Sequence, residues 1–178
     1  ASYSPSGRAS IRRSPDRRAE IAPGELRENT TAPQDDASKK PALLIVEDDP
    51  EMQAFIVRHM APAYRTVTAD NGRLALERLA KNEPFDLILS DVMMPEMDGF
   101  ELCRRVKADL QYSHIPVLLL TAKTDIASKV EGLGTGADLY VEKPFSLEYL
   151  RASISALLSN RELVRRLSSN RHLQNRRR

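Results

Sequence analysis

The sequence predicts an α/β fold with a doubly wound parallel sheet, and two observations along residues 42–158 support it. Short continuous apolar runs recur, and such runs are typical of strands that are buried on both faces. Segments with apolar residues at helical spacing separate these runs. Strand and helix alternate five times within these 117 residues. This alternation favours five parallel strands connected by helices that cover both faces of the sheet.

The first strand and the first helix have the clearest signals. Residues 42–46 read Ala-Leu-Leu-Ile-Val, an uninterrupted apolar run. Asp49 and Pro50 follow, and because aspartate is a favoured N-cap and proline a favoured first helical residue, a helix is expected to begin here. Its apolar residues recur at helical spacing, at Met52, Phe55, Ile56 and Met60.

The remaining elements repeat this alternation. A second strand is expected where β-branched residues gather, and a fourth directly after Pro116. Ser146 is placed to cap a last helix that carries Leu147, Leu150, Ile154, Leu157 and Leu158. The expected strands are 64–68, 86–90, 117–120 and 138–141, and the expected helices between them are 71–82, 99–109 and 125–133.

Charge is distributed unevenly along the chain. Residues 1–41 carry 8 basic and 6 acidic residues, residues 42–158 carry 12 and 18, and residues 159–178 carry 7 and 1. The net charge of +2 therefore hides an acidic middle of −6 and a basic end of +6. The first segment is rich in Ser, Pro and Arg and lacks apolar periodicity, so we expect a disordered linker there.

The composition also bounds the location of the chain. No apolar run of about 18 residues occurs, so no transmembrane helix is expected. No apolar signal region follows the N-terminus. A single cysteine, Cys103, cannot form an internal disulfide, which fits a reducing compartment. These features predict a cytoplasmic segment, of a free protein or of a membrane-anchored parent, without membrane contact of its own.

Polar side chains follow four of the five predicted strands. Glu47 and Asp48 come after the first strand, Asp91 after the third, Thr121 after the fourth and Lys143 after the fifth. The carboxyl ends of parallel strands meet at one edge of a sheet, where ligands bind in open α/β folds. We therefore expect these side chains to converge. The neighbouring Asp49 is instead interpreted as a helix cap.

This set of residue types suits phosphoryl chemistry. Two carboxylates about 4 Å apart repel each other by about 4 kcal/mol at an effective dielectric of 20, so a proton or a cation must join them. Hard oxygen ligands suit Mg²⁺, and the absence of His and Cys from the set argues against zinc. A metal, a lysine and a hydroxyl together neutralise phosphoryl oxygens, and a carboxylate can form an aspartyl-phosphate.

Four stretches of the chain resemble the receiver domain of two-component response regulators: LLIVEDDPE, DLILSDVMMPEMDGFELCRRVK, IPVLLLTA and LYVEKPF. The resemblance covers residues 42–158. It implies a flavodoxin-like fold with strand order 2-1-3-4-5. It also implies a phosphoprotein that acts mainly as a signalling switch and promotes its own phosphorylation and dephosphorylation.

The same resemblance assigns the metal site. Asp91 would be the phosphoacceptor. The magnesium cofactor would be bound directly by Asp48 and Asp91, through water by Glu47, and by the backbone carbonyl of Met93.

The resemblance assigns the remaining roles as well. Lys143 would contact the phosphoryl group, so that Asp91, Thr121 and Lys143 form the catalytic set. Thr121 would be the switch hydroxyl, and Tyr140 would be the aromatic that turns inward when Thr121 is drawn to the phosphate. The Lys143–Pro144 peptide bond would be cis.

The expected partner is the phosphohistidine domain of a histidine kinase. A homodimer through the fourth helix, fifth strand and fifth helix is a further expectation, and no direct nucleic-acid binding by the receiver is expected. The sequences of these stretches, together with the long N-terminal segment, resemble those of hybrid sensor kinases. The alternative is a stand-alone transcriptional regulator whose DNA-binding domain was removed.

The basic segment 159–178 leaves alternatives open. It would extend the last helix, with Leu163, Val164 and Leu167 as an apolar stripe, or it would be a linker to a further domain. A nucleic-acid patch is also compatible with clustered arginines. The linker is the preferred interpretation, because the segment has no room for a helix-turn-helix.

Overall fold

The computed structural model describes residues 40–122 and 135–175, with side chains up to residue 167. Almost all of the predicted linker, and the predicted helix at 125–133, lie outside the described residues. The elements in chain order are β1 (Ala42–Val46), α1 (Pro50–Met60), β2 (Arg65–Ala69), α2 (Gly72–Ala80), β3 (Leu87–Asp91), α3 (Gly99–Ala108), β4 (Val117–Ala122), β5 (Leu139–Lys143) and α5 (Leu147–Asn175).

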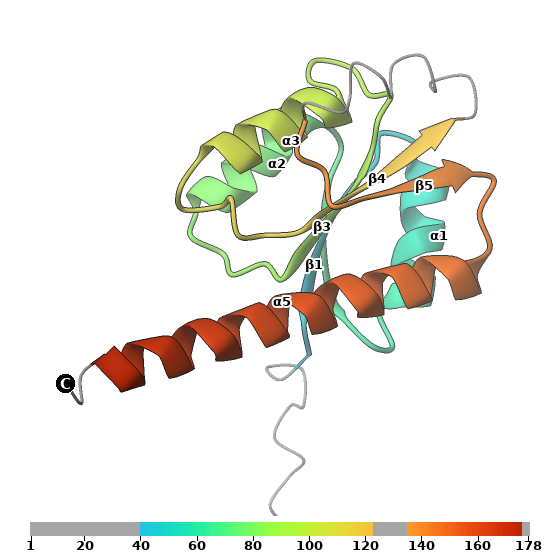
Figure 1. Ribbon diagram of the computed structural model, residues 1–178. Helices are drawn as coiled ribbons and strands as arrows, with labels where there is room; N and C mark the ends of the chain where they lie inside the picture. Colours follow the sequence, from blue (N-terminus) through green and yellow to red (C-terminus); the bar gives the residue numbers. More distant parts are fainter. Residues whose placement is uncertain (1–39, 123–134, 176–178) are drawn as a thin grey trace, which may run out of the picture. The chain divides into compact units, whose positions relative to one another are not determined.

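The five strands form one parallel sheet in the order β2-β1-β3-β4-β5 (Figure 1). This confirms the predicted fold class and strand order. In the centre of the sheet Val46 pairs with Ser90, and Asp91 pairs with Leu120. The carboxyl ends of β1, β3 and β4 therefore lie side by side, and the residues that follow these strands share one edge.

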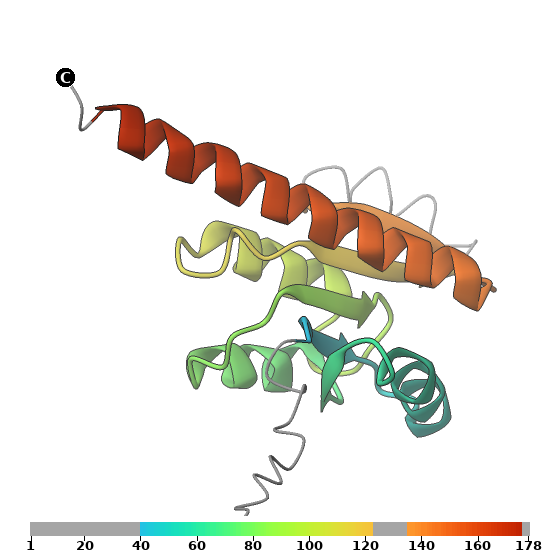
Figure 2. The same cartoon turned by 90° about the horizontal axis from the view of Figure 1, so that it is seen from below.

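Helices cover both faces of the sheet: α2 and α3 lie on one face, and α1 and α5 on the other (Figures 1 and 2). Successive strand residues point to opposite faces. In β1, Leu44 and Val46 join the core under α2 and α3, whereas Leu43 and Ile45 join the core under α1 and α5. This double burial explains why β1 reads as a continuous apolar run.

Side-chain caps fix where the helices begin. The Asp49 carboxylate accepts hydrogen bonds from the amides of Glu51 and Met52, which confirms it as the N-cap of α1. Asn71 and Asp98 cap α2 and α3 in the same way. The Ser146 hydroxyl accepts from the amide of Tyr149, as expected for the start of α5. These caps place the strand-to-helix loops firmly along the carboxyl edge.

The last helix extends beyond the part that packs against the sheet. Leu150 and Ile154 are buried against the sheet, yet α5 continues to Asn175. The helical extension expected as one alternative for the basic segment is observed as far as that residue, and whether the segment also links to a further domain stays a prediction. None of the helices in the described ranges is both long enough and apolar enough to cross a membrane.

Candidate functional site

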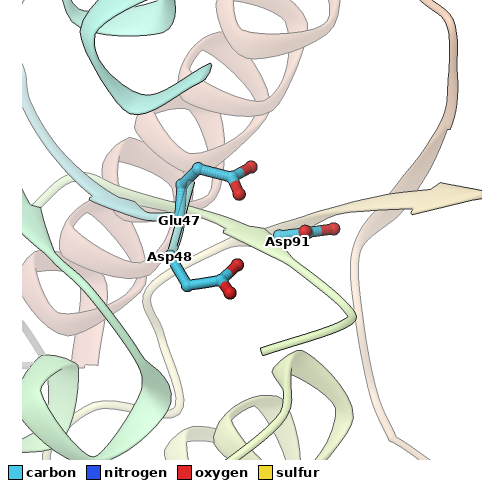
Figure 3. A group of neighbouring side chains, drawn as sticks. All are labelled: Glu47, Asp48 and Asp91. Atoms are coloured by element: carbon cyan, nitrogen blue, oxygen red, sulfur yellow. The ribbon is translucent and has the colours of Figure 1, made fainter. Parts of the chain in front are cut away.

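Three carboxylates gather at the carboxyl edge of the sheet. Glu47 directly follows β1, Asp48 comes next, and Asp91 is the last residue of β3. One ligand atom from each lies within 4.8 Å of the others. Figure 3 shows the three side chains extending from two neighbouring strand ends into the same space. The structure therefore brings together the acids that the sequence placed at the strand ends.

The lysine predicted for this edge joins the acids. Lys143, the last residue of β5, places its Nζ 3.1 Å from Asp91 Oδ2 and 3.4 Å from Glu47 Oε2. The other oxygen of each carboxylate accepts a backbone hydrogen bond, Asp91 Oδ1 from the Val92 amide at 2.8 Å and Glu47 Oε1 from the Asp49 amide at 3.2 Å. Both carboxylates are thus held in fixed orientations.

The site contains more negative than positive charge. Glu47 is 2% exposed and Asp91 is 8% exposed, whereas Asp48 is open to solvent. Burial, and then the charge of Asp91, raise the pKa of Glu47. Burial lowers the pKa of Lys143, but Asp91 and Glu47 outweigh it, so the net shift is upward. The cluster of three carboxylates contains one ammonium, which pairs with Asp91 and Glu47, and the excess negative charge favours the arrival of a further cation.

The donor set fits a hard divalent cation. All three candidate ligands offer carboxylate oxygens, and the exposed Asp48 leaves one side of the cluster open to solvent. Such a site suits Mg²⁺, which keeps several waters and takes few protein ligands. Met93 lies two residues beyond Asp91, with a side chain that is 65% exposed. The role of its carbonyl stays a prediction.

Two further predicted residues lie on the neighbouring strands. Thr121 is fully buried near the end of β4, and its hydroxyl donates to the carbonyl of Ala122 at 3.1 Å. Tyr140 in β5 is half-buried, and its Oη lies 2.9 Å from Thr135 Oγ1. Their proposed switching roles stay predictions. The Lys143–Pro144 bond is cis, as the resemblance implied.

Two residues that the sequence pattern did not single out for the site also shape it. Gly99, the first residue of α3, donates its amide to the Val92 carbonyl at 2.9 Å. A Cβ on Gly99 would lie 2.2 Å from the Asp91 carbonyl oxygen. On α1, the Gln53 amide donates to the Glu47 carbonyl and to Asp70 Oδ1. A glycine and a glutamine in helical segments carry no sequence signal for such contacts.

Comparison with known proteins decides the family. A family described as the response regulator receiver domain matches residues 43–155, which is more than half of the chain. The chain belongs to the response regulator receiver domain family. This match confirms the resemblance inferred from the four sequence stretches. Receiver domains act in two-component signal transduction. The matched residues fall within the predicted receiver segment, 42–158.

Relatives of this receiver domain include both kinases and regulators. The chain is 43% identical over 132 residues to histidine kinase P4 of Formosa agariphila, covering 74% of this chain and 10% of that protein. It is 39% identical over 117 residues to response regulator MprA of Mycolicibacterium vanbaalenii, covering 65% and 49%. The receiver therefore spans about a tenth of the kinase and about half of the regulator.

Solved structures agree with the fold. The receiver domain of a signal transduction histidine kinase from Syntrophus aciditrophicus is 39% identical, with a TM-score of 0.64 over 67% of this chain and 91% of that one. A chemotaxis response regulator of Vibrio cholerae is 34% identical, with a TM-score of 0.60 over 66% and 98%. The likeness covers nearly the whole of each of these neighbours.

Proposed function

We propose that this receiver domain accepts a phosphoryl group on Asp91 from the phosphohistidine of a histidine kinase. The observation that carries the proposal is the position of Asp91, nearly buried at the strand edge between the Lys143 ammonium and the Val92 amide. Asp49, by contrast, is exposed and occupied as a helix cap. Asp91 is thus a carboxylate that is oriented yet still reachable from the open side of the cluster.

The transfer is a displacement at phosphorus. An oxygen of the Asp91 carboxylate forms a bond to phosphorus as the bond from phosphorus to the donor imidazole nitrogen breaks, and the leaving imidazole takes up a proton. Lys143 lies where it would neutralise charge on the phosphoryl oxygens. A bound Mg²⁺ held by Asp48, Asp91 and the Met93 carbonyl, with Glu47 through water, would supply further positive charge there.

The switch is proposed to run through Thr121 and Tyr140. The Thr121 hydroxyl would leave the Ala122 carbonyl for the phosphoryl group, and Tyr140 would then leave Thr135 and turn inward. The affected surface would include β5 and α5, together with the predicted helix at 125–133, which lies outside the described residues. This is also the surface proposed for a phosphorylation-dependent homodimer.

Two parent proteins are compatible with this domain. We favour a hybrid sensor kinase, because histidine kinases from three organisms match at 39–43% identity. The alternative is a stand-alone transcriptional regulator, and response regulators match at 38–39%. The parent sequence before Ala1 and after Arg178 decides between them. A kinase ATP-binding domain upstream supports the hybrid, and a DNA-binding domain downstream without a kinase supports the alternative.

Phosphorylation of the purified chain tests the proposal. Native protein, Asp91→Asn and Asp109→Asn are each incubated with phosphoramidate, with and without Mg²⁺, and the bound phosphoryl group is measured by intact mass. Asp109 is an exposed aspartate at the end of α3 and serves as the matched control. We expect one phosphoryl group on the native and Asp109→Asn chains with Mg²⁺, and none on Asp91→Asn. Equal labelling of Asp91→Asn, or an unlabelled native chain with Mg²⁺, would contradict the proposal.

A further inference from the structure

The part of α5 beyond Arg161 exposes apolar side chains. Leu163, Val164 and Leu167 are 57%, 63% and 54% exposed. Leu163 and Leu167 are four residues apart and therefore neighbours on one face of the helix. Figure 2 shows this half of α5 projecting beyond the sheet. We call Leu163, Val164 and Leu167, with the adjacent Arg166, the α5 stripe.

The stripe differs from the earlier part of the same helix. Leu150 and Ile154 are fully buried against the sheet, and Arg161 is still held by the backbone carbonyls of Phe85 and Asp86. From Glu162 to Leu167 each described side chain is exposed. Single exposed apolar residues are ordinary, but a group of them on one helix marks an interaction surface. A shallow depression of about 460 Å³ on α5 lies beside Leu163 and Arg166, and its lining residues all belong to this helix.

The charge beside the stripe is predominantly positive. Glu162 is the single acid of the segment 159–178, and it is shared by Arg166 at 2.9 Å and Arg165 at 3.8 Å. Beyond Leu167 the sequence adds four arginines and no acid. A partner that buries the apolar side chains must therefore also bring negative charge.

We propose that the α5 stripe binds an amphipathic helix that carries acidic residues beside its own apolar seam. An apolar seam on the partner covers Leu163, Val164 and Leu167, and flanking carboxylates pair with Arg166. In paired helices, charges that flank the apolar seam select the partner. This interaction is separate from phosphorylation of Asp91 and goes beyond the proposed function.

Three other occupants fit the same residues less well. A second copy of the chain would bring an equally basic segment to the contact, and like charges across an interface are unfavourable. Nucleic acid would neutralise the arginines but would leave three apolar side chains uncovered. An anionic membrane needs a broad apolar face, whereas this stripe comprises three residues and lies beside Glu162.

Two designed peptides test the proposal by fluorescence anisotropy against the full chain. Both carry leucine at the a and d positions of each heptad, and they differ only in having glutamate or lysine at e and g. We expect the glutamate peptide to bind at least about tenfold more tightly than the lysine peptide, a difference of about 1.4 kcal/mol. The affinity of the glutamate peptide should fall as salt is added.

Paired variants locate the contact. The double change Leu163→Ala and Leu167→Ala keeps helix propensity while it removes the seam, and it should weaken binding by at least about tenfold. Its control is Leu110→Ala, which alters an apolar residue that is 95% exposed on the α3–β4 connection. Arg166→Glu should weaken binding as well, whereas Arg105→Glu should not, although Arg105 forms the same kind of i, i+4 pair, with Glu101 at 2.8 Å. Circular dichroism checks that each variant keeps its helix content.

Several outcomes would overturn the proposal. Equal binding of the lysine peptide would remove the role of charge. If the stripe variants and their controls changed peptide affinity equally, the peptide would not bind at the α5 stripe. Concentration-dependent self-association that Leu163→Ala and Leu167→Ala abolish, with no peptide binding, would make the occupant a second copy. Tight binding of duplex DNA or anionic vesicles without peptide binding would identify a different class of partner.

Discussion

Acidic and basic side chains lie at both edges of the sheet, but they are paired differently at the two edges. At the carboxyl edge, three carboxylates lie together, and the ammonium of Lys143 is shared by two of them, Glu47 and Asp91. At the amino edge, Asp86 and Asp138 each stand directly before a strand, and each has a cation of its own, Arg161 at 2.9 Å and Lys107 at 2.7 Å. At the carboxyl edge the carboxylates outnumber the ammonium, whereas at the amino edge Asp86 and Asp138 each have one cation.

The amino-edge aspartates also form reciprocal backbone contacts. The Asp86 amide donates to the Ala42 carbonyl at 2.8 Å, and Asp86 Oδ2 accepts from the Ala42 amide at 2.8 Å. Asp138 makes the same pair of contacts with Val117. Each aspartate thus joins the start of its own strand to the start of the neighbouring strand. Asp86 and Asp138 each have a cation and a backbone amide of their own, whereas Glu47 and Asp91 share the one ammonium of Lys143.

The largest loss of stability is expected at Gly99, where the backbone near Asp91 leaves no room for a side chain. In Gly99→Ala the new methyl group would meet the Asp91 carbonyl oxygen at 2.2 Å, so the backbone that holds the phosphoacceptor must shift. We expect a loss of about 3 kcal/mol in the free energy of unfolding, measured by urea denaturation. Ser90→Ala is the control, because it removes a hydrogen bond to the same oxygen without crowding it and should cost about 1 kcal/mol. Equal stability of Gly99→Ala and the native chain would contradict this account.

The amino edge should be the next most sensitive. Asp86→Ala removes the acceptor of the Ala42 amide and leaves the guanidinium of Arg161 without its carboxylate, although Arg161 is largely buried. We expect a loss of about 2 kcal/mol in the free energy of unfolding. Asp138→Ala should show a loss of similar size, because its contacts are equivalent. If neither variant is destabilised, the amino-edge contacts are not structural.

Removing an acid from the carboxyl edge should have the opposite sign. Asp48→Asn relieves repulsion within the cluster, so without metal we expect the free energy of unfolding to rise by about 1 kcal/mol. Mg²⁺ at ten times its dissociation constant should stabilise the native chain by about 1.4 kcal/mol, and should stabilise Asp48→Asn far less. Asp86→Ala should keep the full response to Mg²⁺. A destabilised Asp48→Asn in metal-free buffer would show that the cluster is not repulsive.

The sequence predicted the carboxyl edge far better than the amino edge. The central strands β1, β3 and β4 are buried on both faces, so their apolar runs mark where each one ends, and Glu47 and Asp91 follow from that alone. Lys143 ends the edge strand β5, which is mostly half-buried and gives a weaker signal. Asp86 carries no comparable signal, because its partners Ala42 and Arg161 lie 44 and 75 residues away. Contacts at such separations depend on tertiary packing rather than on local pattern.

The length of α5 was hidden for a related reason. The apolar pattern continues beyond Leu158 at Leu163, Val164 and Leu167, but the domain does not bury these residues, so the pattern left a helix and a linker both open. Beyond Leu158, Arg161 holds the helix against the start of β3, and ion pairs from Glu162 to Arg165 and Arg166 support the next turn. An arginine contact with backbone carbonyls has no periodicity in the sequence, so the pattern alone did not decide in favour of the helix.

The smallest expected effect is on the pH dependence of the free energy of unfolding. It should differ between Glu47, in the cluster at the carboxyl edge, and Glu101, an ion-paired surface acid. Burial and Asp91 raise the pKa of Glu47, so the native chain retains a proton that the unfolded chain releases. In metal-free buffer, native stability should therefore fall as pH rises from 4.5 through the raised pKa. Glu47→Gln lacks this titration, so its stability relative to the native chain should improve over the same interval. Urea denaturation at a series of pH values measures the difference.

Glu101 on α3 provides the control of opposite sign. Arg105 and Arg104 lower its pKa, so the stability it contributes is present at neutral pH and is lost as pH falls below 4.5 through the lowered pKa. Glu101→Gln should therefore be less stable than the native chain at neutral pH, and the two should converge on acidification. A Glu47→Gln profile that follows the Glu101→Gln profile would mean that Glu47 is compensated as fully as a paired surface acid. The carboxyl edge would then not differ from the amino edge in charge compensation at Glu47, the most buried of its three carboxylates.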